Sequence, residues 1–257
     1  MTRQVMLLKI GGNELREDDF VPRLAQAIAS RKNDCNCVMV HGGGRVIDDM
    51  MARLDVSPVY VEGQRFTDEE ALEISEMVLS GHVNKLLVRA LLAVDVDAVG
   101  LSGVDGGLLQ VEPWAKDMGR VGRIVHVRTE LFDHLFKLGL LPVLSPISNG
   151  PDGHYNVNAD HAAGMVAGAL GADLAVFISD VPGVMEDGQL VPQLTGTQAQ
   201  GLIDQGKIYG GMIPKVNAAL AALEQGAQQS MITNLDGFIN GSGTSTVSYT
   251  HLRAHET

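Results

Sequence analysis

The chain has 257 residues, of which 45% are hydrophobic and 19% charged, and its net charge is −12 at neutral pH. This length can bury a large core in one α/β domain or in two small lobes. The acidic balance argues against nucleic acid or an anionic membrane as a partner, since both require basic patches. The sequence shows no signal peptide and no apolar run of about 18 residues, so a cytoplasmic protein is expected.

Apolar stretches of strand length alternate with stretches of helical periodicity. In chain order the pattern predicts a strand at 5–8, a helix at 20–30, a strand at 37–40, a helix at 46–54, two helices within 68–92 that meet at Gly81, a strand at 98–101, a hairpin of 108–111 with 121–127, a strand at 141–144, a helix at 161–170, a strand at 174–178 and a helix at 216–225. Such alternation predicts an α/β fold, a three-layer α-β-α sandwich with a mostly parallel central sheet.

No long Pro/Gly/Ser linker divides the chain, so two lobes of one continuous sheet are expected, at residues 1–170 and 171–247. Residues 248–257 lose the composition seen upstream and are interpreted as a foreign or disordered tail. Cys35 and Cys37 lack the further Cys and His ligands of a zinc site, which favours an apolar structural role.

Two lysines lie beside glycine turns far apart in the sequence. Lys9 follows the first strand and precedes Gly11 and Gly12, and Lys215 follows Gly210 and Gly211 at the start of a helix. Fixed cations on glycine-lined turns suit a site that handles a polyphosphate. The lysine precedes its glycines, so this is not the P-loop, and a solvated turn remains the alternative for Lys9.

The run 42–44 consists of three glycines between a strand and a helix, which suits an anion against bare backbone at a helix N-terminus. A tight structural turn is the alternative, and His41 is as compatible with a turn residue as with a catalytic one. Arg65 precedes a helix that Thr67 or Asp68 can cap, and an arginine can grip a carboxylate with two hydrogen bonds. Taken alone, it is better interpreted as a surface arginine.

Asn156 and Asn158 would face one side of an extended segment, and Asp160 could hold two lysines by ion pairing. The alternative is that Asn158 or Asp160 only caps the following helix. The polar turn at 179–184 follows a parallel strand, at the sheet edge where α/β proteins bind ligands.

Together these runs resemble the amino acid kinase family, and within it the members that act on N-acetyl-L-glutamate, over about residues 5–247. The resemblance rests on an ordered set of segments: 9–12 (KIGG), 41–44 (HGGG), 63–68 (GQRFTD), 83–85 (VNK), 100–106 (GLSGVDG), 155–160 (YNVNAD), 179–184 (SDVPGV) and 210–215 (GGMIPK).

The resemblance implies ATP-dependent phosphorylation of the γ-carboxylate of N-acetyl-L-glutamate, a step of arginine biosynthesis, with Mg²⁺ held mainly by the nucleotide and no metal site of the protein's own. It assigns residues 1–170 to substrate binding and dimerisation and residues 171–247 to nucleotide binding. The implied catalytic residues are Lys9, Asp160 and Lys215, with Asp160 orienting both lysines. The implied substrate residues are Gly43, Gly44, Arg65 and Asn156. The implied nucleotide residues are Gly11, Gly12, Asp180, Val181, Pro182, Gly183, Val184, Met185, Lys207, Ile208 and Tyr209.

The chain departs from the family pattern in having Gln64 and Phe66 around the arginine and a short, polar segment at 233–247. It also lacks the N-terminal helix of arginine-inhibited members, which leads us to expect a homodimer insensitive to arginine, with an interface helix within 68–92. Two alternatives remain open: a kinase acting on glutamate or aminoadipate linked to a carrier protein, and a non-catalytic sensor of acetylglutamate or nucleotide.

Overall fold

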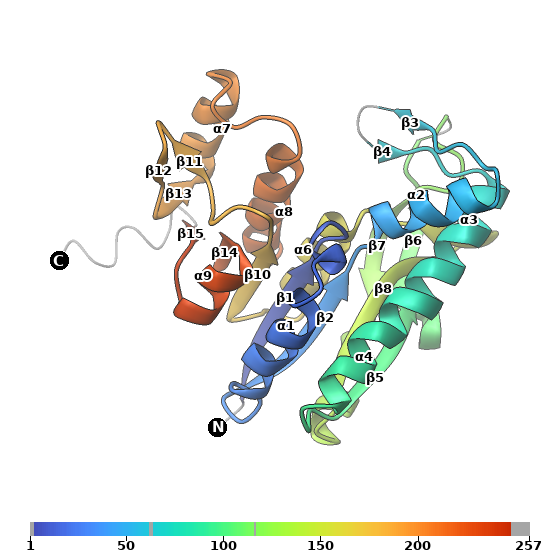
Figure 1. Cartoon of the computed structure of the whole chain (residues 1–257), viewed down its shortest axis with the longest axis horizontal. Coiled ribbons are helices and arrows are strands. Elements are labelled where there is room, and N and C mark those ends of the chain that lie inside the picture. The colour runs from blue at the N-terminus through green and yellow to red at the C-terminus, as the bar shows by residue number, and fades with distance from the viewer. Residues whose placement is uncertain (1–2, 62–63, 116, 248–257) are drawn as a thin grey trace.

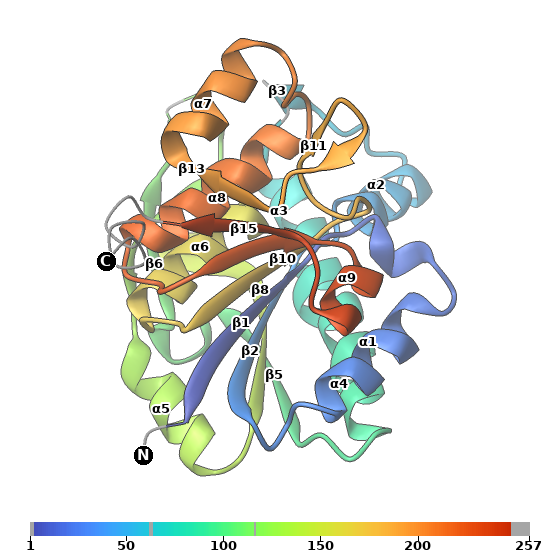
Figure 2. The ribbon, with the colours of Figure 1, turned by 90° about the vertical axis from the view of Figure 1, so that its left-hand side faces the viewer.

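A computed structural model of the chain describes residues 3–61, 64–115 and 117–247. The predicted tail at 248–257 and the first residue of the segment 63–68 lie outside the described residues. Within the described part, eleven strands form one continuous sheet that runs through both predicted lobes (Figures 1 and 2).

The sheet is mostly parallel, as predicted. Its order is β13-β15-β14-β10-β1-β2-β8-β6-β7, and β5 and β9 also pair with β8. Antiparallel pairing is confined to β14 with β15, β6 with β7 and β8 with β9. The strands are β1 (Gln4–Ile10), β2 (Cys35–His41), β5 (Ala98–Gly103), β6 (Leu109–Pro113), β7 (Gly122–Val127), β8 (Leu141–Gly150), β9 (Gly153–Asn156), β10 (Leu174–Ile178), β13 (Gln193–Thr195), β14 (Ser230–Thr233) and β15 (Thr244–Val247). Two small antiparallel pairs lie outside it: β3 (Tyr60–Val61) with β4 (Gln64–Arg65), and β11 (Met185–Glu186) with β12 (Gln189–Leu190).

Helices cover both faces of the sheet, which makes the three layers (Figure 2). One face carries α1 (Phe20–Ala29), α2 (Gly44–Arg53), α3 (Glu69–Glu76), α4 (Asn84–Leu92) and α9 (Leu235–Asn240). The other face carries α5 (Thr129–Lys137), α6 (Ala159–Ala169), α7 (Gly196–Asp204) and α8 (Met212–Glu224).

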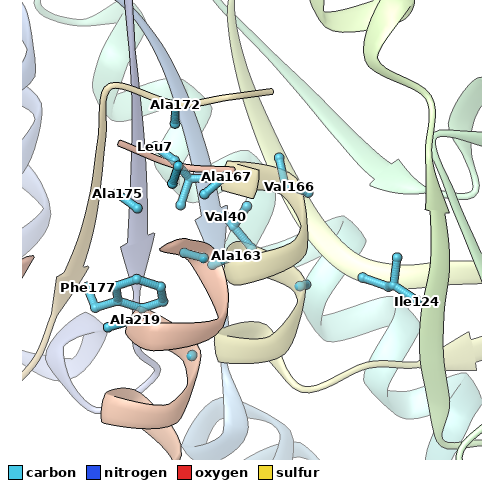
Figure 3. Close-up of a cluster of buried hydrophobic side chains, with 14 of the residues drawn as sticks. Leu7, Val40, Ile124, Ala163, Val166, Ala167, Ala172, Ala175, Phe177 and Ala219 are labelled. Carbon is cyan, nitrogen blue, oxygen red and sulfur yellow. The ribbon is translucent and has the colours of Figure 1, made fainter. Parts of the chain in front are cut away.

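The central strands are apolar on both sides, because each face of the sheet is buried under helices. In β1, Leu7 belongs to the core under α6 and α8, whereas Leu8 belongs to the core under α1 and α4. Figure 3 shows the first of these cores, in which Phe177 of β10 packs near Ala219 of α8. Small residues on α6 and α8 let these two helices approach closely: a Cβ placed on Gly164 of α6 would lie 3.0 Å from the Ala218 carbonyl oxygen of α8.

The predicted strands and the hairpin are confirmed, with β8 longer than expected. The prediction of two helices meeting at Gly81 is wrong, because α3 and α4 are joined by a π-helical segment, Met77–Val83. Its residues Val78, Leu79 and Val83 are buried in the core, so packing holds the helix together across the glycine. The last strand, β15, forms and pairs with both β13 and β14.

Helix α8 begins at Met212, earlier than the predicted 216. Pro214 is compatible with this start because the first turn of a helix leaves its N–H groups unpaired. Lys215 therefore lies inside the first turn of α8. None of the helices in the described part of the chain has the length and apolarity required to cross a membrane.

Candidate functional site

Several predicted site residues lie at or just after the carboxyl ends of three adjacent strands: Lys9, Gly11 and Gly12 at β1, Gly43 and Gly44 after β2, and Asp180 after β10. The chain leaves β1 towards the face covered by α1, and after β10 it goes on to α7 and α8 on the opposite face. Such a reversal between neighbouring parallel strands opens a crevice at the sheet edge, where α/β proteins bind ligands.

A cavity of about 380 Å³ lies at this edge, and we call it the central cavity. It brings together residues from 9 to 215 of the sequence. Its lining includes every predicted catalytic and substrate residue, together with both glycines after β1: Lys9, Gly11, Gly12, Gly43, Gly44, Arg65, Asn156, Asp160 and Lys215.

The two glycine loops of the cavity are in direct backbone contact. The Gly42 amide donates a hydrogen bond to the Ile10 carbonyl (2.9 Å). A Cβ placed on Gly12 would lie 2.7 Å from the Gly44 nitrogen and 2.9 Å from the Gly43 Cα. Glycine at position 12 is therefore required by this close approach, and it leaves bare backbone facing the cavity at the start of α2.

Lys9 is almost fully buried and is paired with one carboxylate. Its Nζ lies 2.7 Å from Asp160 Oδ1, and the two side chains are 4% and 14% exposed. The direction from which the Lys9 ammonium approaches Asp160 Oδ1 does not meet the geometry of a hydrogen bond. The contact between the two side chains is therefore described as an ion pair. A buried ammonium requires such a partner because its desolvation costs several kcal/mol.

Lys215 reaches the same cavity from the first turn of α8. Its Nζ donates to the Gly211 carbonyl at 3.3 Å. Among the described residues it forms no ion pair within 4 Å, so the structure joins Asp160 to Lys9 but does not show the second contact expected of Asp160. The cavity nevertheless places both ammonium groups around one space.

Arg65 is held rigidly at the edge of the cavity. Its Nη2 donates to Asp48 Oδ1 (2.8 Å), to the Tyr60 hydroxyl (2.8 Å) and to the Gly44 carbonyl (3.1 Å). Its guanidinium also lies over the Tyr60 ring, 4.9 Å from the centroid. Arg65 is thus an oriented arginine that lines the cavity, and its side chain is only 7% exposed, unlike that of an ordinary surface arginine.

The asparagines at the entrance to α6 have different roles. Asn158 is the N-cap of α6, and its side chain accepts a hydrogen bond from the Asp160 amide (2.8 Å). Asn156 instead donates to the Thr67 hydroxyl (3.2 Å) and lines the cavity. Asp68 caps α3 by accepting from the Ala71 amide (2.8 Å). Capping thus explains Asn158 and Asp68, while Asp160 and Asn156 remain available to the site.

The two predicted nucleotide segments are linked through the β11–β12 hairpin. Lys207 Nζ lies 2.5 Å from Glu186 Oε1, which ties the segment before α8 to the β11–β12 hairpin. Ile208 is buried, whereas Tyr209 is 74% exposed. Val184 is held against β15, since its backbone amide donates a hydrogen bond to the Thr244 hydroxyl (2.8 Å). Of the remaining predicted residues, Asp180, Val181, Pro182 and Gly183 lie in the turn between β10 and β11, and Met185 begins β11. The predicted nucleotide residues 180–185 and 207–209 do not line the central cavity.

His41 is a buried structural residue. Its Nδ1 donates to the Gly42 carbonyl (3.1 Å), and its Nε2 accepts from the Asn84 amide (3.2 Å). The pKa of His41 is lowered from 6.5 to about 4, mainly because the imidazole is buried. The positive charge of Lys85 lowers this pKa further. A neutral imidazole in this position fixes the turn into the glycine loop.

Sequence reasoning missed Glu14, Asp48 and Tyr60. Glu14 is 5% exposed and lines both the central cavity and an adjoining cavity of about 90 Å³ that also contains Asp180. Burial raises the pKa of its carboxyl, against the lowering effect of Lys9 and Lys215. A single acidic residue two positions after a glycine pair carries no sequence signal that would identify it.

The charge of the central cavity is opposite to that of the whole chain. It is lined by four cationic side chains (Lys9, Arg45, Arg65 and Lys215) and two acidic ones (Glu14 and Asp160), a net charge of +2 in a chain of −12. The N-termini of α2 and α6 also reach it and add partial positive charge. This arrangement can bind an anionic ligand and stabilise negative charge that moves during a reaction.

The cysteines lie away from this site, in β2. Both are free, and Cys37 is buried in the core, as the apolar interpretation predicts. The part of the chain that the structure describes holds no cluster of three or more His, Cys, Asp or Glu side chains suited to a metal ion.

The chain is similar to known proteins over nearly its whole length. It is 47% identical to an acetylglutamate kinase of Roseiflexus sp. (strain RS-1), covering 99% of this chain and 97% of that protein. It is 42% identical to an acetylglutamate kinase of Methanopyrus kandleri, covering 93% of this chain and 98% of that protein. A crystal structure of smu.665 from Streptococcus mutans UA159 superimposes with a TM-score of 0.83 at 28% identity, covering 95% of this chain and 98% of that one. The profile of the amino acid kinase family matches residues 4–234, and the chain belongs to the amino acid kinase family.

Proposed function

We propose that the protein transfers the γ-phosphoryl group of ATP to the γ-carboxylate of N-acetyl-L-glutamate, as a cytoplasmic enzyme of arginine biosynthesis. The observation that carries this proposal is the convergence of Lys9, Asp160 and Lys215 on one cationic cavity at the carboxyl edge of the sheet. The names of the relatives described above point to the same substrate.

The reaction requires charge stabilisation more than proton transfer. A substrate carboxylate is already ionised at neutral pH, so its oxygen can attack the γ-phosphorus in line without a general base. Negative charge then spreads over the transferring group, and Lys9 and Lys215 are the fixed cations that stabilise it. Asp160 holds Lys9 in place, and the neutral His41 takes no part.

The substrate would lie along the N-terminal side of the cavity. Arg65 would bind its α-carboxylate, since the guanidinium is already oriented by Asp48 and Tyr60. Backbone N–H groups of Gly43 and Gly44, together with the Asn156 amide, would hold the polar atoms of the acetylated amino group. A preorganised site of this kind lowers the entropy cost of bringing the two reactants together.

The nucleotide would lie across the C-terminal lobe, with its phosphates reaching Gly11 and Gly12. The turn at 180–185 and the segment 207–209 would contact its base and ribose. Mg²⁺ would arrive on the phosphates and neutralise part of their charge. The nucleotide would hold this ion mainly by itself, and the exposed carboxylate of Asp180 would be available to its hydration shell.

The test is ADP release that depends on N-acetyl-L-glutamate, with the acyl phosphate trapped by hydroxylamine. We expect release with this substrate and none above background with free glutamate or with a carrier-protein conjugate of glutamate or aminoadipate. Turnover only on the conjugate would replace the proposed substrate. Binding of N-acetyl-L-glutamate without ADP release would instead identify a sensor.

We further propose a homodimer formed through the helical stretch from α3 to α4. Large apolar side chains are exposed on this stretch, where Met77 and Leu92 are about half exposed and Leu86 is 39% exposed. Apolar exposure of this kind marks interaction surfaces. Light scattering should give twice the chain mass for the native protein and the monomer mass for Met77→Glu, and a native monomer would refute the proposal.

A further inference from the structure

Glu14 is the one buried acidic residue of the central cavity that the mechanism above does not use. It is 5% exposed, and its Oε2 is fully buried and accepts no hydrogen bond from any described residue. A Cβ placed on Gly11 would lie 2.3 Å from this oxygen, which locates it directly over the glycine loop after β1. An unpartnered carboxylate oxygen in such a place is costly, so a cationic partner is expected.

Two cations are near enough to act on the Glu14 carboxyl. Lys9 and Lys215 both lower its pKa, which burial raises, and Asp180 raises it further. Lys9 is already paired with Asp160 at 2.7 Å. Lys215, in contrast, has one long hydrogen bond to the Gly211 carbonyl and no ion pair within 4 Å among the residues described. The unpaired ammonium and the unpaired carboxylate thus line the same cavity.

We propose that Glu14 is the positioning residue for Lys215: the Lys215 ammonium exchanges between the Gly211 carbonyl and Glu14 Oε2, and the second arrangement aims it at the phosphate path beside Lys9. Each catalytic lysine then has its own carboxylate, Asp160 for Lys9 and Glu14 for Lys215. A lysine on a flexible four-carbon stem can make this change by side-chain rotation alone. The pairing of Glu14 with Lys215 does not depend on the proposed function, whereas its effect on phosphoryl transfer rests on that function.

The first experiment measures the pair without any substrate. The free protein is treated with acetic anhydride, and modification of each lysine is followed by mass spectrometry. Because an ammonium bound to a carboxylate is protected, Glu14→Gln should increase the modification rate of Lys215 several-fold relative to Lys32, with Glu17→Gln as the matched control. Glu17 is an exposed carboxylate of the same loop, outside the central cavity. An unchanged Lys215 rate in Glu14→Gln would overturn the proposal.

The second experiment is a double-mutant cycle in the phosphoryl-transfer assay. Glu14→Gln should lower kcat about tenfold with little change in either KM, whereas Glu17→Gln should leave kcat within about twofold. In a Lys215→Ala background Glu14→Gln should have almost no further effect, because a residue that acts through Lys215 has nothing left to position. Independent, multiplying effects would contradict the proposal.

Two further outcomes separate this inference from other accounts. If the native protein does not phosphorylate N-acetyl-L-glutamate, the proposed function fails, while the labelling experiment still tests the pair. If Glu14→Gln weakens binding of Mn²⁺–ADP and leaves Lys215 labelling unchanged, Glu14 serves the metal ion and the pairing is wrong.

Discussion

Lys9 and Arg65 illustrate how much of this site depends on partners that hold a charged group still. Lys9 is paired with Asp160 in a nearly dry position, and Arg65 is fixed by Asp48, Tyr60 and a backbone carbonyl. Such partners reduce the motion that a charged group must lose when a ligand binds. The site residues thus act as small networks.

Replacing Arg65 with lysine should mainly weaken substrate binding. Lysine keeps the charge but loses the planar fork that can bind a carboxylate with two hydrogen bonds. We expect the KM for N-acetyl-L-glutamate to rise about tenfold or more, as expected for loss of a charge-assisted hydrogen bond, with a smaller change in kcat. Steady-state kinetics would measure both constants. Arg23→Lys, at an exposed ion pair with Asp236, should change neither.

Individual site residues were predictable where the sequence pattern and the fold coincide. Lys9 lies near the end of an apolar strand and Gly12 and Asp180 each follow one, and the carboxyl ends of parallel strands meet at one edge of the sheet. Glu14 was not predictable, because its importance comes from its burial and from the charges of Lys215 and Asp180, which lie far from it in the sequence. The partners of Arg65 depend in the same way on how the loop before α3 folds back onto α2.

At the scale of elements, the two glycine loops act as one unit. Gly12 and the start of α2 are in van der Waals contact, so β1 and β2 set the shape of the cavity together. The alternation of apolar residues was sufficient to predict these strands and the helices between them. It was not sufficient to predict the π-helical segment, which depends on packing in the core. Nor could it predict the early start of α8, which is possible because the first turn of a helix tolerates proline.

Adding one methyl group at Gly12 should separate the loops. The new Cβ would approach the Gly43 and Gly44 backbone to less than 3 Å, and backbone at a helix start cannot move aside without shifting the site. We expect Gly12→Ala to lower kcat/KM about a hundredfold, the order expected for a displacement of about 1 Å in an active site. Gly81→Ala has open space around its Cβ and should keep normal activity. Equal activity of the two variants would show that the loop contact is unimportant.

At the scale of the whole molecule, one continuous sheet connects the two sides of the cavity. Strand β1 pairs with β2 on one side and with β10 on the other, so the glycine loops after β1 and β2 and the turn after β10 extend from neighbouring strands. The polar network around His41 lies beneath this junction. Asn84 Nδ2 lies within hydrogen-bond distance of His41 Nε2 (3.2 Å), the Val143 carbonyl (2.8 Å) and the Leu101 carbonyl (3.3 Å), which joins α4 to three strands.

The buried His41 should make the protein acid-sensitive. Its pKa in the folded state is about 4, below the ordinary value of 6.5. Between pH 6.5 and 4 the histidine is protonated in the unfolded chain but still neutral in the folded protein. The contribution of neutral His41 to the free energy of unfolding is therefore complete above pH 6.5 and is lost as the pH falls towards 4. We expect a loss of about 3 kcal/mol in the free energy of unfolding from this residue. Urea titrations across this pH range would measure it.

The control for this prediction is His41→Asn, which removes the titrating group while keeping a polar side chain at the turn. This variant should be less stable at pH 7.5 but should lose less stability than the native protein between pH 6.5 and 4. Parallel pH profiles for the two proteins would show that His41 does not control acid unfolding.

The central claim is that two lysines, Lys9 of β1 and Lys215 of α8, stabilise the phosphoryl group in transit, and Lys215→Ala tests it most directly. We expect kcat for N-acetyl-L-glutamate-dependent ADP release to fall on the order of a hundredfold or more, with the dissociation constants of both substrates largely kept. Lys32→Ala, on a lysine that donates to the Asp95 carbonyl far from the cavity, should keep the native rate. An unchanged kcat in Lys215→Ala would contradict the account.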